Sequence, residues 1–379
     1  MQHFLRSLFA PGAFLALGFS LLLPEASPAQ EQEERPLVEK GEERFLEEEL
    51  EVAMAMQPVV EGGSAFFRMG TGSTVSSSFQ LGRIIASAIS KPYGSRPCNR
   101  GGGCGVLGLI ATSQSTEGSL QTFERMKEGR LEAGVMRSDV AYDAVRRKKN
   151  DLTPVYGTSM RSIANLYPQY LQILARVGSD VRKLEDIRGK RVAIGLPGDG
   201  MRPMVDVMLG ELELKEKDLE LVFMTAEEAY FSINEGSLDA VVMFDSAPSR
   251  LAELLLTSNR VIMLQIPEAV RMALIDSNRA FSDHRLPVGT YSSVPPIETI
   301  RTPGQLIVRS DLDARLVYEI TRALWHQTTV EKIGDERVLD ETIDVEMAID
   351  DMIVPLHPGA LRFYSEIGLL SGKKLHSRD

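Results

Sequence analysis

The sequence predicts an α/β fold built as two lobes with a ligand cleft between them. Segments with strand character alternate with segments whose apolar residues recur at helical spacing, from about residue 65 onward. This alternation runs through two successive sets of elements, and a return segment follows. We therefore expect lobe 1 to comprise residues 63–178 and 300–379, and lobe 2 to comprise residues 179–299. Loops rich in glycine, serine and aspartate follow the predicted strands, at the sheet edge where such folds bind ligands.

The elements of lobe 1 follow from the local pattern. They are a strand at 65–69, a glycine-containing turn at 70–74, a helix with an apolar stripe over 79–89, a strand in GVLGLIATSQS, a helix in GSLQTFERMKEG, a strand in LEAGVM and a helix in VAYDAVRRK. Ser138 or Asp139 is expected to cap the last of these helices, because serine and aspartate side chains accept backbone N–H groups at helix starts.

Lobe 2 repeats the same order of strand, loop and helix after a strand in YLQILAR. It begins with a strand at 191–194, a loop of glycine, proline and aspartate, and a helix, and continues with strand LELVFM, helix AEEAYFSINEG and strand LDAVVMF. The return segment is predicted as strand GQLIVRS, helix DLDARLVYEITRALW and the closing stretch PLHPGALRFYSEIGLL.

The composition is that of an ordinary globular protein, with 379 residues, 43% hydrophobic and 25% charged. The formal net charge of -11 makes nucleic acid an unfavourable partner. The 5 histidines show no metal-ligand spacing, and no phosphate-binding loop, hydrolase or metalloprotease motif is present. We therefore predict a monomeric binding protein with no metal, no cofactor and no enzymatic activity.

The N-terminus has the three parts of a secretory signal. Arg6 supplies positive charge, Phe14–Leu23 is apolar, and Ser27 and Ala29 offer small side chains for cleavage. We expect a signal peptide over residues 1–29 and export to the periplasm. A retained membrane anchor is the alternative, although the apolar run is short for a spanning helix. Residues 30–62 are expected to form an acidic linker, helical in part.

The two cysteines, Cys98 and Cys104, flank the glycine-rich loop CNRGGGC. In an exported protein this pair is expected to form a disulfide. A loop of this size would contribute roughly 2 kcal/mol in the chain-entropy account. A redox or metal pair is the alternative, but the spacing is not CxxC and no histidine lies nearby in the sequence.

Arg137 stands at the end of the apolar run 131–136, directly before a predicted helix. A buried guanidinium needs an anion, and its planar fork matches a carboxylate in two-point geometry. We expect Arg137 to contact a ligand carboxylate. The alternative is an internal ion pair with Asp139, Asp199 or Asp245; of these, Asp139 is expected to cap its own helix instead.

Other candidate ligand contacts lie in the loops after the predicted strands. Hydroxyls in the first loop suit a carboxylate at a helix N-terminus, although they could also only cap the helix and turn the chain; these are Thr71, Ser73, Thr74 and Ser78. Ser119 could contact ligand or cap its helix, and Ser138 follows Arg137.

Two loops of lobe 2 complete the set of candidates. Asp199, Gly200 and Met201 belong to one loop and Asp245 to another, with packing as the alternative for the thioether of Met201. The two aspartates could bind a ligand ammonium or lock an empty cleft by pairing with Arg137.

The order of motifs over residues 66 to 370 resembles the TAXI class, the TRAP-associated extracytoplasmic immunogenic solute-binding proteins. The matching segments include FRMGTGST, STEGSLQTFERMKEGRLEAGVMRSDVAYDA, ANLYPQYLQILAR, DIRGKRVAIGLPGDG, EGSLDAVVMFDSAPSRLAEL and VPLHPGALRFYSEIGLL. The resemblance implies a type II periplasmic binding protein fold. It also implies lobe closure on a small carboxylate or amino acid, similar to glutamate or 2-oxoglutarate, and delivery to a TRAP membrane permease.

The chain departs from the TAXI pattern in four loops. A tyrosine pair common in the class is replaced by Ser78 and Phe79, and Arg137 stands where the class often has glutamine. The loops 198–201 and 244–248 gain Asp199 and Asp245. A periplasmic sensing subunit with altered specificity, which signals to a membrane receptor and docks through the acidic segment 31–56, is therefore the alternative function.

Overall fold

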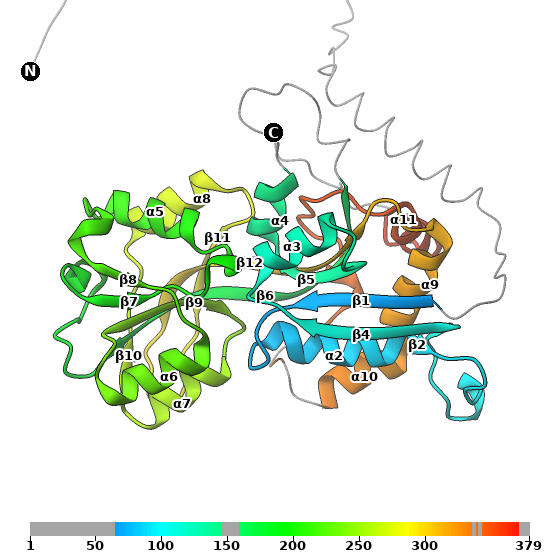
Figure 1. Cartoon of the computed structure of the whole chain (residues 1–379), viewed down its shortest axis with the longest axis horizontal. Helices are drawn as coiled ribbons and strands as arrows, with labels where there is room; N and C mark the ends of the chain where they lie inside the picture. The colour runs from blue at the N-terminus through cyan, green and yellow to red at the C-terminus, as the bar shows by residue number, and fades with distance from the viewer. Residues whose placement is uncertain (1–64, 146–158, 336–338, 340–342, 371–379) are drawn as a thin grey trace, which may run out of the picture. The chain divides into compact units, whose positions relative to one another are not determined.

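The computed structural model describes residues 65–145, 159–335, 339 and 343–370 (Figure 1). The predicted signal peptide and acidic linker lie outside these residues and remain predictions. Within the described ranges, no helix has both the length and the apolar character needed to span a bilayer.

Ten strands form one continuous sheet in the order β4-β1-β5-β12-β6-β9-β7-β8, with β10 paired to β6 and β11 paired to β12. The strands of the first half are β1 (Ala65–Thr71), β4 (Leu109–Ser115), β5 (Ala133–Arg137) and β6 (Met160–Arg176). Those of the second half are β7 (Arg191–Ala193), β8 (Glu220–Val222), β9 (Ala240–Asp245), β10 (Val261–Met263), β11 (Ser282–Leu286) and β12 (Ile297–Arg309). A separate two-stranded sheet pairs β2 (Ser90–Lys91) with β3 (Val106–Leu107).

The two halves of the sheet repeat one strand order. In the first half, β4, β1 and β5 run parallel, β12 lies antiparallel beside β5, and β6 follows. In the second half, β8, β7 and β9 run parallel, β6 lies antiparallel beside β9, and β10 follows. Each half thus borrows its one antiparallel strand from the other. This arrangement confirms the predicted two-lobe α/β fold of the type II periplasmic binding proteins.

The long strands β6 and β12 connect the two halves by pairing with each other antiparallel. Pro168 lies opposite Pro303 in this pair, and neither residue has an N–H to donate to the ladder. On one side of this point β12 pairs with β5, and on the other side β6 pairs with β9. The carboxyl ends of β5 and β9, at Arg137 and Asp245, are therefore held on opposite sides of the crossover. The division into lobes at residues 178 and 300 remains a prediction, because β6 and β12 belong to both halves.

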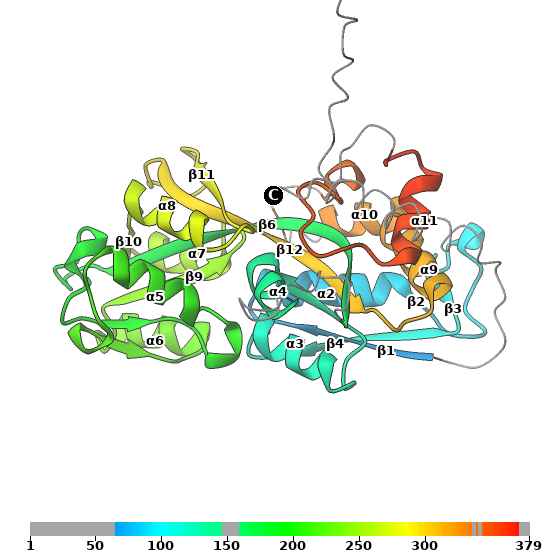
Figure 2. The ribbon, with the colours of Figure 1, turned by 90° about the horizontal axis from the view of Figure 1, so that it is seen from above.

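Helices cover both faces of the sheet, as Figures 1 and 2 show. They are α2 (Ser77–Ile89), α3 (Ser119–Lys127), α4 (Ser138–Val145), α5 (Arg202–Glu211), α6 (Ala226–Glu235), α7 (Arg250–Thr257), α8 (Glu268–Ser277), α9 (Ala314–Leu324), α10 (Gln327–Asp335) and α11 (Pro358–Glu366). Short 3-10 helices are η1 (Cys98–Arg100), η3 (Leu184–Ile187), η4 (Pro197–Asp199), η5 (Glu216–Asp218) and η6 (Val345–Met347). The alternation of strands and helices was predicted, whereas α7, α8, α10 and the short strands β2, β3, β10 and β11 were not.

The helix α2 illustrates how the sequence specifies these elements. Ser76 caps it by accepting the N–H of Phe79, and the apolar stripe of Leu81, Ile85 and Ile89 is fully buried. The stripe joins a core that spans the first half of the sheet, while two further cores lie on the two faces of the second half. Each half therefore buries apolar surface of its own.

The predicted disulfide between Cys98 and Cys104 is confirmed, with a Cα–Cα distance of 4.8 Å. The side chain of His326, remote in sequence, lies with its ring nitrogen within 4.8 Å of both sulfur atoms. Both sulfurs are engaged in the bond, so the pair is a structural link across a glycine-rich loop.

We expect Asp239→Asn to lower the free energy of unfolding by about 2 kcal/mol at pH 7. Asp239 precedes β9 and accepts hydrogen bonds of 2.9 to 3.0 Å from Arg176 and Arg191, so it ties β6, β7 and β9 together. Hydrogen bonding to Arg191 holds the pKa of this carboxyl far below its usual range. The stabilisation is therefore present above the unfolded pKa of about 4 and is lost as the pH falls further.

Urea unfolding at pH 7 and at pH 3 measures this effect, with the exposed Asp276→Asn as the matched control. An equal loss of stability at both pH values would contradict the ionic role of Asp239.

Candidate ligand-binding site

A cleft of about 640 Å³ lies at the carboxyl ends of the strands, where loops from both halves of the sheet meet. The first half contributes 72–76, Ser78, 115–119, Gln121, Arg125, Val135 and Arg137. The crossover contributes Gln169, and the second half contributes Ala193, Gly195, Leu196, Asp199, 224–227, Ala229, 241–245 and Leu251. The predicted position of the cleft, at the loops that follow the strands, matches this arrangement.

Arg137 is the last residue of β5, and its side chain is only 3% exposed. Its Nε donates to one carboxylate oxygen of Asp139 at 3.0 Å and its Nη2 donates to the other at 2.9 Å. The expectation that Asp139 caps its own helix instead of pairing with Arg137 is wrong. The two residues meet because the strand ends at Arg137 and α4 starts at the next residue, which places Asp139 in the first turn.

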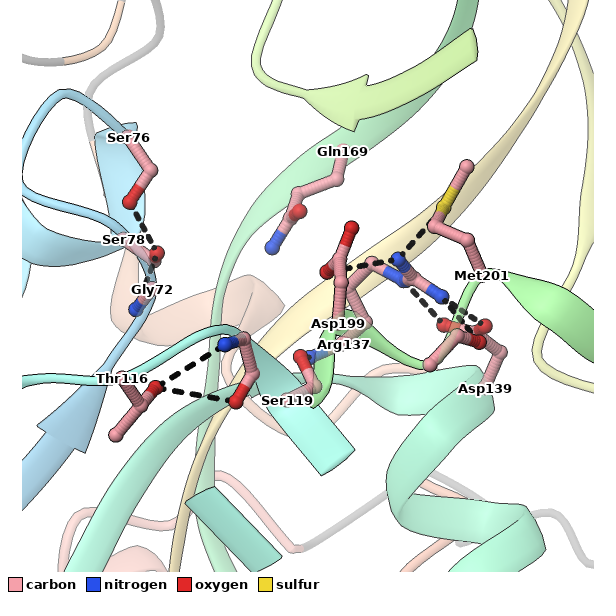
Figure 3. A network of polar contacts seen from close by, with 12 residues as sticks. Gly72, Ser76, Ser78, Thr116, Ser119, Arg137, Asp139, Gln169, Asp199 and Met201 are labelled. Atoms are coloured by element: carbon pink, nitrogen blue, oxygen red, sulfur yellow. Dashed lines mark hydrogen bonds and ion pairs between the residues drawn. The ribbon is translucent and has the colours of Figure 1, made fainter. Parts of the chain in front are cut away.

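The same guanidinium also contacts the second half of the fold (Figure 3). Its Nη1 lies 3.0 Å from Met201 Sδ and 3.5 Å from Asp199 Oδ1, and its Nη2 lies 3.4 Å from the carbonyl oxygen of Gly200. The ring of Phe244 stacks on it, 4.8 Å from ring centroid to Cζ. Each guanidinium nitrogen of Arg137 thus already has a protein acceptor.

The N-terminus of α3 forms one wall of the cleft. Gly118 precedes it with φ 150°, and a Cβ there would lie 2.5 Å from Asp199 Cα, so only glycine fits. The Oγ of Ser119 accepts the backbone N–H of Arg137 at 2.9 Å instead of capping the helix. Among the described residues, the amides of residues 119–121 have no hydrogen-bond acceptor, as is usual for the first turn of a helix.

Hydroxyl groups gather in the loop between β1 and α2. Ser76 and Ser78 are 2.9 Å apart through their Oγ atoms, and Ser78 Oγ accepts the N–H of Gly72 at 3.2 Å. Thr74 Oγ1 donates to Glu227 Oε1 across the cleft at 3.5 Å. The Oγ of Ser73 is buried and has no hydrogen-bond partner among the described residues.

Asp245 ends β9 and faces the cleft from the second half. Burial raises its pKa to about 6, although the Ser77 hydroxyl and the backbone N–H of Ser246, at 2.9 Å from Oδ1, favour the charged form. Burial also raises the pKa of Asp199, against the opposing effect of Arg137. Repulsion between carboxylates adds to both shifts, because Asp199 raises the pKa of Asp245 and Asp139 raises the pKa of Asp199.

The structure places the predicted site residues in two groups. Seven line the cleft, namely Ser73, Thr74, Ser78, Ser119, Arg137, Asp199 and Asp245. Four lie behind its wall, namely Thr71, Ser138, Gly200 and Met201. Thr71 donates to the carbonyl of Gln114, Ser138 is fully buried, and Gly200 and Met201 contact Arg137. Their roles as ligand contacts remain predictions.

Several polar residues of the cleft were not predicted, among them Glu117, Glu227 and Gln169. Glu117 stands in the loop after β4 and Glu227 in the first turn of α6, after β8, so the same rule that selected the other candidates could have found them. Gln169 lies inside the apolar strand β6, and its place in the cleft follows only from the crossover with β12.

The Arg137–Asp139 pair leads to a test by a double-mutant cycle. We expect Arg137→Gln alone and Asp139→Asn alone each to cost about 3–5 kcal/mol, because each leaves one buried charge without its partner. The double variant removes both charges and should cost less than the sum by about 1–3 kcal/mol. Free energies of unfolding in urea measure the cycle, and additive losses would show that the pair is not coupled.

A second prediction concerns the buried carboxyl of Asp245. Its raised pKa means that ionisation opposes folding as the pH rises from the unfolded pKa of about 4 through about 6. We expect Asp245→Asn to stabilise the ligand-free protein by about 2 kcal/mol at pH 8 and to have little effect at pH 4. Unfolding curves at the two pH values decide this, and a loss of stability at pH 8 would show that the charged form is instead well compensated.

Three solved structures are similar to this chain at low sequence identity. A structure from Bordetella bronchiseptica RB50 is 13% identical, covers 81% of each chain and has a TM-score of 0.45. The GluR0 ligand-binding core from Nostoc punctiforme, in complex with (L)-glutamate, is 15% identical over 72% of this chain and 97% of its own, with a TM-score of 0.41. The alkanesulfonate-binding protein SsuA from Xanthomonas axonopodis pv. citri, bound to MOPS, is 15% identical over 75% and 97%, with a TM-score of 0.38. Residues 69–368 match the model of the NMT1-like family, and the chain therefore belongs to the NMT1-like family.

Proposed function

We propose that this protein is an exported solute-binding protein that takes a small carboxylate or amino acid into the cleft and delivers it to the membrane permease of a TAXI-type TRAP transporter. The observation that carries the proposal is the cleft itself, a space of about 640 Å³ that is lined by both polar and apolar side chains and built from loops of two sheet halves. A space of this size suits a small solute that is enclosed on both sides.

Contacts across the cleft support binding by lobe closure. Besides the contacts of Arg137 with Gly200 and Met201, polar atoms of the two halves meet in five further pairs. These are Thr74 with Glu227, Ser77 Oγ with Ser246 Oγ at 2.7 Å, Gly198 N with Glu117 at 3.1 Å, Arg137 with Asp199, and Asn278 Nδ2 with the carbonyl of Asp139 at 3.2 Å. Hydrogen bonds of this kind, made only when the halves approach, favour a closed state over an open one.

The cleft can open and close at the crossover of β6 and β12. Among the described strands, only β6 and β12 link the halves through strand pairing. Pro168 and Pro303 interrupt their ladder, and the register also shifts beyond Gly304. A rotation there would open the cleft without breaking the pairing within either half. Such hinges are few residues long and absorb the change in backbone angles.

The lining supports binding more than turnover. In the described part of the chain, the cleft has hydroxyls and carboxylates but no imidazole or thiol that could form an activated nucleophile. The TRAP part of the proposal rests on the order of sequence motifs over residues 66 to 370, and export rests on the sequence of residues 1–29. The disulfide agrees with an oxidising compartment.

The test is thermal and chemical unfolding of the full chain with a panel of small organic acids and amino acids. A ligand at 100 times its Kd should stabilise the protein by about 2.7 kcal/mol. Ala226→Trp, which places an indole at the cleft wall, should abolish the gain, and Ala226→Ser should keep it. If no member of the panel stabilises the protein, or if a bound member is chemically converted, the proposal is wrong.

A further inference from the structure

We propose that the cleft recognises its solute through a primary ammonium group, which the carboxylates of Asp199 and Asp245 bind. The inference rests on the proposed solute-binding function and narrows the class of solute to amines, amino acids included. It separates them from dicarboxylates such as 2-oxoglutarate, which carry no cationic group.

The first argument is that the arginine of the cleft is already neutralised. Both carboxylate oxygens of Asp139 are bound to Arg137, with N–O distances of 2.9 and 3.0 Å, and both side chains are at most 6% exposed. The remaining guanidinium contacts go to Met201, Gly200 and Asp199. A solute carboxylate would have to displace one of these buried partners, and displacing Asp139 would leave a buried charge unpaired.

The second argument is the balance of charge around the cleft. Among its described lining residues, four carboxylates face two guanidinium groups; the four are Glu117, Asp199, Glu227 and Asp245, and the two are Arg125 and Arg137. The negative charge of Asp139, which lies behind the cleft wall, neutralises the positive charge of Arg137. Arg125 stands at an exposed edge of the cleft, near the carbonyl of Ser115. A dianion would enter an acidic space, whereas a cation would supply the charge that this space lacks.

The third argument is that acceptors in the cleft lack donors. Asp199 Oδ2 has no hydrogen-bond donor among the described residues, and its carboxylate is 29% exposed to the cleft. Asp245 accepts the N–H groups of Ser246 and Ser77 and the Ser77 hydroxyl, all of them neutral donors, and no cationic side chain of the described residues binds it. An ammonium offers three donors, which match acceptors that converge from different elements.

An independent observation points to the same kind of ligand. Gln169 comes from the crossover strand, between the ends of β5 and β9, and is 6% exposed. Its amide nitrogen donates to Tyr167 Oη at 3.1 Å, while its amide oxygen has no donor among the described residues. The side chain lines the same cleft as Arg137 and Asp199 (Figure 3). An amide oxygen in this position is available to a donor that a ligand supplies. Asp199, Asp245 and Gln169 thus offer acceptors from three separate segments to one cationic donor group.

The inference is tested by calorimetric titration of the full chain, first freed of retained solute by unfolding and refolding. The ligands are matched in skeleton: L-glutamate and L-glutamine carry the ammonium, 2-oxoglutarate and glutarate lack it, and butane-1,4-diamine carries it without a carboxylate. We expect at least one ammonium-bearing member to bind at least tenfold more tightly than the two dicarboxylates. Asp199→Asn and Asp245→Asn should each weaken that binding at least tenfold, and the exposed Asp276→Asn should leave it unchanged.

Weaker binding by Asp245→Asn cannot be attributed to unfolding, because this substitution is expected to stabilise the ligand-free protein. Binding of 2-oxoglutarate or glutarate that equals or exceeds that of the ammonium-bearing ligands would overturn the inference and leave the solute-binding function standing. Amine binding that is unchanged in both aspartate variants would also overturn it. If no ligand of either kind binds, the proposed function fails, and the inference fails with it.

Discussion

The pairing of β6 with β12 is the constraint on which the rest of the structure depends. These two strands supply the antiparallel member of each half of the sheet, so neither half is complete without a strand that also belongs to the other. Their register fixes where β5 and β9 end, and hence where Arg137 and Asp245 face the cleft. The paired prolines at the crossover leave a short stretch without mutual ladder bonds, which is where two rigid halves can turn.

The electrostatics of the cleft follow from one buried cation. Arg137 is desolvated at a strand end, and the fold compensates it with Asp139 from the next turn, Asp199 from across the cleft, and the face of Phe244. These contacts occupy the guanidinium N–H groups of Arg137 that would otherwise bind a solute carboxylate. Excess acid is then left on the opposite wall, where burial raises the pKa of Asp245 and Asp199. The same charges that oppose folding of the empty protein are those that a cationic solute would satisfy, which is a common relation between stability and binding.

Close packing around this site explains two of its glycines. Gly118 must be glycine because Asp199 of the other half lies against it, and within the first half a Cβ at Gly72 would lie 2.8 Å from the hydroxyls of Ser76 and Ser78. Contacts link the four loops that depart from the TAXI pattern, because Arg137 contacts Asp199 and Phe244, and Ser77 contacts Ser246. A change of residue in one loop therefore alters the space and charge available to the others. Membership of the NMT1-like family sets the scaffold, and these loops set what the scaffold can hold.

The sequence by itself determined the α/β alternation, the position of the cleft after the strand ends, the disulfide, and seven of the candidate residues that line the cleft. It could do so because apolar periodicity, turn residues and cysteine spacing are local signals. It did not determine short elements such as β10 and β11, whose strand conformation depends on the long strands beside them. Only the tertiary structure decided that Asp139 meets Arg137 and that Gln169 reaches the cleft. Both contacts depend on the exact end of β5 and on the register of β6 against β12. A local sequence pattern predicts neither the direction of a side chain at a strand end nor the pairing of residues more than a hundred positions apart.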